Sequence, residues 1–130
     1  MGKFRKHIDV PGLIHRAPSP MGVRIGNMIF SGGIYGCNTE TQEVPKNDPD
    51  LQAKYLFENV KKFMETAGAS IDHIAHVKVF VKEDSLREYI NKYWVELFPD
   101  KDDRPCRHAQ VMEMRGDMLM QVELIAVIPE

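Results

Sequence analysis

Two stretches with helical periodicity limit what this chain can fold into more than any other feature. In the first stretch, Asp48 and Pro49 suit the N-cap and the first position of a helix, and Gly68 suits its end. In the second stretch, the apolar residues between Asp84 and Pro99 also repeat with a period near 3.6. Because each helix has one apolar face, both must pack against another apolar layer.

The segments around these helices have the short alternating or β-branched patterns of strands. They cover residues 3–8, 22–26, 28–32, 76–81, 106–114 and 118–128. We expect the last two to form a hairpin with its turn at 115–117, and residues 32–47 to form a long loop. This order predicts an α+β fold in which a mixed sheet of five to six strands carries two long helices on one face. The chain of 130 residues has the length of a single domain, so we expect one domain over residues 1–130.

The composition excludes several functional classes. The chain contains 17 Lys and Arg against 19 Asp and Glu, and this net charge of −2 argues against binding to nucleic acid. It contains no apolar run of about 18 residues, so we expect no membrane span. Cys37 and Cys106 form no CxxC motif, and His73 and His76 have no third partner at a metal-ligand spacing. We therefore expect two free thiols, a cytoplasmic location and no metal.

One short motif stands out as a candidate site. Arg104 and Arg107 flank Pro105 where a loop enters a predicted strand. The planar fork of an arginine matches a carboxylate, and the proline restricts the backbone beside it. The spacing alone favours surface ion pairs for both arginines, with Asp102, Asp103 or Glu96 as partners.

Strand parity adds a second constraint. Gln121 and Glu123 share one face of the last predicted strand, because side chains alternate along a strand. If the last two strands are neighbours, Arg107 meets one of these residues across the sheet. A carboxylate beside an arginine would supply an acid or base next to an anion anchor, whereas Gln121 can only orient water.

A set of short pieces spread over the chain forms a further pattern: 26–32 (GNMIFSG), Gln52, Asn59-Val60, Ala67-Gly68, 76–82 (HVKVFVK), Asn91, Arg107 and 122–127 (VELIAV). Through these pieces the sequence resembles the RidA family, also called YjgF or YER057c, from about Pro18 to Val127. No single piece is specific, but their order and spacing together identify the family.

The resemblance implies a chorismate-mutase-like fold, a homotrimer with active sites between subunits, and hydrolysis of small reactive 2-imino or 2-enamino acids without a cofactor. It implies that Arg107 clamps the substrate carboxylate. Ser31, Gly32 and Asn91 match cleft residues of the family, and backbone groups up to Gly33 are expected to help hold a water. The resulting set of expected site residues is Arg107, Glu123, Gln121, Ser31, Gly32, Gly33, Asn91 and Arg104.

This chain also departs from the best-known branch of the family. Ala109 stands where that branch has cysteine, residues 17–21 lack the usual tyrosine, and Gln121 stands where a water-positioning glutamate is usual. The motif Arg-Pro-x-Arg-His therefore suggests a different substrate. One alternative is a dicarboxylic enamine such as 2-aminomuconate, with Arg104 or Arg24 binding the second carboxylate. Another is a carboxylate-binding or ribonuclease-like protein without deaminase activity.

Overall fold

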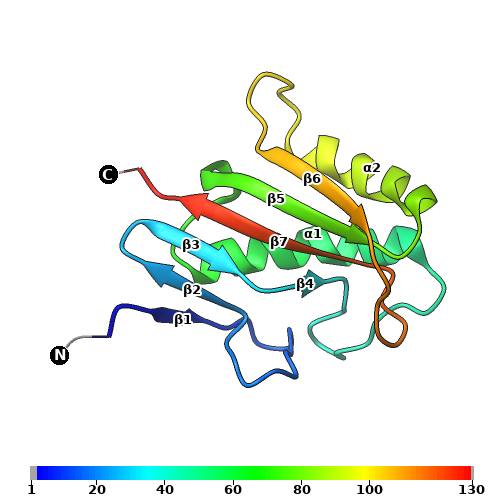
Figure 1. Ribbon diagram of the computed structural model, residues 1–130, viewed down its shortest axis with the longest axis horizontal. Coiled ribbons are helices and arrows are strands. Elements are labelled where there is room, and N and C mark those ends of the chain that lie inside the picture. The colour runs from blue at the N-terminus through cyan, green and yellow to red at the C-terminus, as the bar shows by residue number, and fades with distance from the viewer. Residues whose placement is uncertain (1–2, 130) are drawn as a thin grey trace.

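Within residues 3–129, seven strands form one mixed sheet, and both long helices cover the same face of it (Figure 1). The computed structural model describes residues 3–129. Its strands are β1 (Lys6–Ile8), β2 (Gly22–Ile25), β3 (Met28–Ser31), β4 (Ile34–Tyr35), β5 (Ile74–Val81), β6 (Cys106–Val111) and β7 (Met120–Val127). Its helices are α1 (Pro49–Thr66), α2 (Arg87–Leu97) and the single 3₁₀ turns η1 (Ile71–His73) and η2 (Asp84–Leu86).

The helix boundaries follow the residues that predicted them. The Asp48 carboxylate accepts a hydrogen bond from the backbone N–H of Leu51, at 3.1 Å, and so caps α1. Gly68 ends this helix with a φ of +78°, a conformation that costs glycine little. The second helical stretch begins as η2 and continues as α2. Neither helix within residues 3–129 combines the length and the apolar character needed to cross a bilayer.

The order of the strands corrects one expectation. The sheet runs β1-β2-β3-β7-β5-β6, and β4 adds to β7. The predicted hairpin between the last two strands is therefore wrong, because β5 lies between β6 and β7 (Figure 1). Side chains of β7 alternate between buried and half-buried, as suits a central strand, whereas those of β6 are half-buried or exposed, as suits an edge. Strand β6 pairs in parallel with β5, and the connection between these two strands contains α2.

The expected number of strands is also corrected, from five or six to seven. The added strand β4 lies within the segment 32–47 that was predicted to be a loop. Its two residues pair with β7, Ile34 opposite Val122 and Tyr35 opposite Gln121. Two residues are too few to show an alternating pattern in the sequence.

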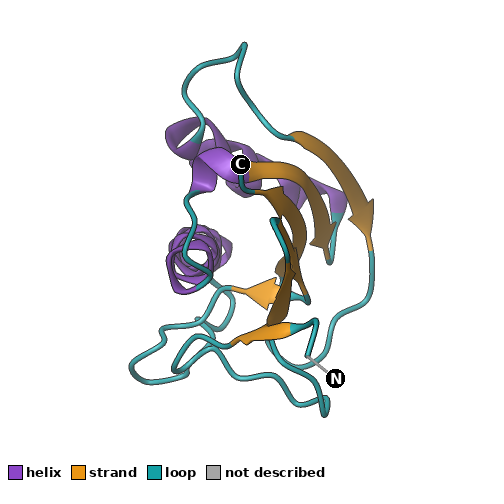
Figure 2. Ribbon diagram, turned by 90° about the vertical axis from the view of Figure 1, so that its left-hand side faces the viewer, coloured by secondary structure: helices purple, strands orange, loops and turns teal. Residues whose placement is uncertain are grey.

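The core lies between the helices and the sheet, and no helix of the described part of the chain covers the opposite face of the sheet (Figure 2). Val77 and Val79 of β5 point into this core together with their partners Leu124 and Val122 of β7. The residues that alternate with these along β5 and β7 have their side chains on the open face. The register of the sheet therefore decides which face each candidate site residue occupies.

Two buried amide side chains attach the long loops to α1. Gln52 Nε2 donates to the backbone carbonyls of Pro45 and Asp117, both at 2.8 Å, and its Oε1 accepts from the N–H of Leu119 at 2.9 Å. Asn59 Nδ2 donates to the carbonyls of Tyr35 and Cys37 at 2.9 and 3.0 Å. These bonds satisfy backbone groups of irregular segments that would otherwise be buried without partners.

We predict that Gln52→Ala lowers the free energy of unfolding by about 3 kcal/mol, because three backbone groups lose their partner at once. Chemical denaturation followed by circular dichroism measures this change. Lys61→Ala, at an exposed position of the same helix, is the control and is expected to change stability by less than about 0.5 kcal/mol. Equal stability of the two variants would contradict this role of Gln52.

Candidate functional site

Arg107 lies in a half-buried position at the start of the edge strand β6. Its guanidinium carbon stands 5.0 Å from the centroid of the Trp94 ring, and its Nη2 donates a hydrogen bond to Asn91 Oδ1. Both partners belong to α2, one helical turn apart. Stacking and the hydrogen bond together hold the guanidinium in one orientation.

The environment of Arg107 leaves its charge without a counter-ion. No carboxylate lies within 4.0 Å of the guanidinium in the chain between residues 3 and 129. Burial lowers the pKa of Arg107, and the nearby charge of Arg87 acts in the same direction. An arginine nevertheless remains protonated at neutral pH. A partly desolvated, oriented guanidinium without a counter-ion is suited to binding an anion.

The register separates Arg107 from Gln121 and Glu123. Arg107 pairs with Val77 and therefore lies on the helix-covered face of the sheet. Glu123 pairs with Lys78, on the open face. Because β5 also lies between β6 and β7, the expected contact of Arg107 with Gln121 or Glu123 within one chain does not form.

Gln121 instead lines a second feature, a cavity of about 640 Å³ on the other side of the molecule. A Cβ added to Gly33 would lie 3.1 Å from the carboxamide atoms of Gln121, so the two residues pack directly together. Tyr35 lines the same cavity, and its hydroxyl donates to the carbonyl of Ile14 at 2.6 Å. The lining residues are Ile14, His15, Arg16, Ala17, Gly33, Tyr35, Gln42, Val44, Arg115, Gly116, Asp117, Met118 and Gln121.

His15 brings a titratable group into this cavity. Its Nε2 would lie 3.5 Å from a Cβ added to Gly32, so the imidazole packs against the glycine that follows β3. Its Nδ1 lies 3.4 Å from the hydroxyl of Ser19. An imidazole ring can both accept and donate a proton, so His15 can exchange protons with a bound molecule.

Ser31 has a structural partner rather than a place in the cavity lining. Its hydroxyl donates to the carbonyl of Gly32 and accepts from the backbone N–H of Leu124, both at 2.8 Å. The hydroxyl thereby links the end of β3 to β7 where the main-chain pairing between these strands stops. Ser31 thus helps to fix the backbone that leads into Gly32 and Gly33.

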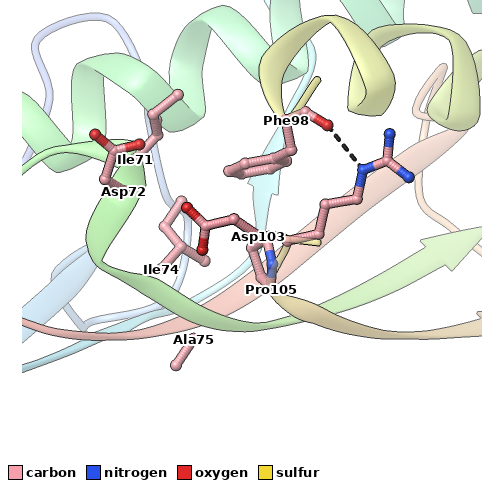
Figure 3. Close-up of a pocket in the computed structure, with 8 residues that line it drawn as sticks. Ile71, Asp72, Ile74, Ala75, Phe98, Asp103 and Pro105 are labelled. Carbon is pink, nitrogen blue, oxygen red and sulfur yellow. Dashed lines mark hydrogen bonds between the residues drawn. The ribbon is translucent and has the colours of Figure 1, made fainter. Parts of the chain in front are cut away.

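Arg104 lies at a different and smaller pocket, of about 130 Å³, between η1 and the loop before β6 (Figure 3). Its Nε donates to the carbonyl of Phe98 at 2.8 Å, and Asp72 and Asp103 line the same pocket. Arg24, the other arginine considered for a second carboxylate, donates to the carbonyls of Gly26 and Ala67. Neither Arg104 nor Arg24 lines the larger cavity.

The structure thus brings the expected residues together in two groups, Arg107 with Asn91 and Gly33 with Gln121, while Glu123 lies two residues beyond Gln121 on the open face. Sequence reasoning missed His15, Arg16 and Arg115 in the cavity. They come from two separate loops, and no local pattern marks them. Within residues 3–129, no three or more His, Cys, Asp or Glu side chains are grouped so as to hold a metal ion.

Comparison of the sequence and the structure with known proteins identifies relatives of this chain. The model of the family described as endoribonuclease L-PSP matches residues 15–128. A RutC family protein of Pyrococcus abyssi is 33% identical over 85% of this chain and 91% of its own length. The 2-iminobutanoate/2-iminopropanoate deaminase of Escherichia coli strain K12 is also 33% identical, over 85% of this chain and 87% of its own length. The crystal structure of the YjgF gene product of Escherichia coli superposes with a TM-score of 0.83 at 30% identity, covering 94% of this chain and 98% of that one.

Proposed function

Because the chain belongs to the endoribonuclease L-PSP family, we propose that it is an imine and enamine deaminase. Its substrates are small 2-imino or 2-enamino carboxylic acids, and its products are 2-oxo acids and ammonia. The name of the Escherichia coli relative, 2-iminobutanoate/2-iminopropanoate deaminase, supports this reaction class. The two thiols Cys37 and Cys106 are free, which fits a cytoplasmic location.

The observation that carries the proposal is the unpaired guanidinium of Arg107. Trp94 and Asn91 orient it, and its planar fork can donate two parallel hydrogen bonds to the substrate carboxylate. The reacting C2 carbon is bonded directly to that carboxylate. Binding the carboxylate in one orientation therefore also positions C2 for attack by water.

The reaction proceeds by addition and elimination. The water oxygen bonds to C2 and releases one proton, while the π electrons of the C=N bond move to nitrogen, which takes up a proton. In the resulting carbinolamine, nitrogen takes up a second proton and leaves as ammonia with the electrons of the C–N bond, while the hydroxyl group releases its proton and the C2 carbonyl forms. No electrons leave or enter the substrate, so this chemistry needs only a positioned water and groups that carry protons.

Gln121 and His15 are the side chains that suit those two tasks in the cavity. The Gln121 carboxamide can hold water as a donor and an acceptor, but it cannot act as a base. The His15 imidazole can accept the proton that the attacking water releases and later return it to the leaving nitrogen. The carboxylate of Glu123 lies on the same face of β7 and is a further candidate proton carrier.

A complete site then requires two copies of the chain. Arg107 lies on the helix-covered face at the edge of the sheet, whereas Gly33 and Gln121 lie at the cavity beyond the open face. We propose a homotrimer in which Arg107 and Asn91 of one subunit face the cavity of the next. Cyclic assembly of this kind repeats the same contact three times and closes.

We predict that Arg107→Lys lowers kcat/KM for 2-iminobutanoate at least about tenfold, because an ammonium group offers no planar fork to the carboxylate. Loss of the imine, generated in situ from the amino acid, measures the rate. Arg5→Lys, at an exposed position outside the cavity, is the matched control and retains the wild-type rate. A wild-type rate in Arg107→Lys would exclude the carboxylate clamp.

The role of His15 predicts a loss of rate on substitution. His15→Gln is expected to lower kcat/KM for 2-iminobutanoate at least about tenfold, because a carboxamide cannot accept the proton that the attacking water releases. His7→Gln, with an exposed histidine on β1, is the control and keeps the wild-type rate. A wild-type rate in His15→Gln would remove His15 from the proton transfers.

Shared sites predict complementation between two inactive variants. Arg107→Ala removes the clamp, and Gly33→Leu fills the space against Gln121. Co-expressed in equal amounts, the two variants are expected to recover about a quarter of the wild-type activity, since random mixing leaves that share of contacts with both halves intact. No recovery in mixed trimers, or a monomeric mass near 14.9 kDa in solution, would show that the site is not shared.

A further inference from the structure

Two arginines of the larger cavity have no partner that explains their presence. Arg16 and Arg115 both line it, and both are exposed. Neither side chain takes part in a hydrogen bond or an ion pair with any residue between 3 and 129. By contrast, Arg24 and Arg104 are each bonded to main-chain carbonyls elsewhere.

The loops that carry these arginines are fastened to the body of the protein. Gln52 binds the carbonyl of Asp117 and the N–H of Leu119, next to Arg115. The Tyr35 hydroxyl binds the carbonyl of Ile14, two residues before Arg16. Because the backbone of both loops is already held in place, less conformational entropy is lost when the two arginine side chains bind a ligand.

The electrostatic balance of the cavity favours an anion. The lining contains two arginines and His15 but only one carboxylate, that of Asp117, which forms no ion pair with Arg115. Burial raises the pKa of the Tyr35 hydroxyl, and the nearby Cys37 adds to this, whereas the charge of Arg16 acts in the opposite direction. The charge of Arg16 thus acts on Tyr35, which lines the same cavity.

The size of the cavity also exceeds the needs of the simplest imino acids. At about 640 Å³ it falls within the range that holds ligands of drug size. A four-carbon imino acid, anchored by its carboxylate and C=N group, would leave much of this space and both arginines unused. A longer substrate with a second negative charge would fill the space and pair the arginines.

We propose that Arg16 and Arg115 bind a second carboxylate, so that the preferred substrates are dicarboxylic 2-imino or 2-enamino acids. This inference rests on the deaminase function proposed above. Arg107 holds the carboxylate next to C2, and the two cavity arginines of the neighbouring subunit hold the distal carboxylate. The reacting carbon then lies between two fixed anchors, which orients it better than one anchor alone.

A matched pair of substrates tests the proposal. Oxidation of norvaline in situ gives 2-iminopentanoate, and oxidation of glutamate gives 2-iminopentanedioate. The two imino acids have the same five-carbon chain and differ only in a terminal methyl or carboxylate group. For the wild type, we expect kcat/KM to be at least about tenfold higher for the dicarboxylate, since one charge-assisted hydrogen bond typically contributes that factor.

The variants Arg16→Gln, Arg115→Gln and the double variant assign the preference to these residues. Each single variant is expected to reduce the ratio of the two kcat/KM values several-fold, and the double variant to bring it close to one, chiefly through KM for the dicarboxylate. Arg5→Gln, with an exposed arginine outside the cavity, is the matched control and keeps the wild-type ratio.

A binding measurement separates this inference from the deaminase proposal. Trp94 is the single tryptophan of the chain and contacts Arg107, so its fluorescence reports a carboxylate at the clamp. We expect 2-oxopentanedioate to bind at least about tenfold more tightly than 2-oxopentanoate, and the double variant to lose this difference.

Each outcome has a defined meaning. A wild-type ratio near one, or a preference that survives in the double variant, overturns the second carboxylate site but leaves the deaminase proposal standing. Failure to hydrolyse either imino acid overturns the deaminase proposal. In that case, tight binding of the dicarboxylate that depends on Arg16 and Arg115 would still support the site, and equal binding of the two oxo acids would overturn it.

Discussion

The bonds from the buried amides Gln52 and Asn59 of α1 hold the rest of the structure in place. Together they bind five backbone groups of the segments 35–45 and 117–119, which have few regular hydrogen bonds of their own. Gly36 lets the first segment approach closely, because a Cβ there would lie 1.9 Å from the carbonyl oxygen of Gln52. Without these contacts, the loops around the cavity would lose both their hydrogen bonds and their position.

The second constraint is the central position of β7. It separates β3 from β5, pairs with β4 and leaves β6 at the edge. Arg107 can therefore lie at the border of the molecule, stacked on Trp94, with its charge accessible from outside. The same arrangement puts Gln121 on the opposite face, beside Gly33. A reaction that uses both groups then depends on contact between subunits, which connects the order of the strands to the proposed assembly.

Particular residues show which parts of the fold and the site could be predicted from the sequence. The caps Asp48 and Gly68 predicted both ends of α1, because capping depends on residues a few positions apart. Arg107 stood out because a second arginine and a proline precede it within one motif. The hairpin of the last two strands was predicted incorrectly, since alternation reveals which side chains of a strand share a face but not which strand lies beside it. Arg16 and Arg115 had no local signal at all.

The sequence by itself determined the local elements: two amphipathic helices, most of the strands, which residues of one strand share a face, and the family resemblance. These depend on periodicity and capping, which act over a few neighbouring residues. Only the tertiary structure decided that β5 lies between β6 and β7, that Arg107 stacks on Trp94, and that two distant loops place Arg16 and Arg115 around one cavity. These features depend on contacts between residues far apart in the chain, where the burial of whole strands and the satisfaction of loop hydrogen bonds outweigh local preference.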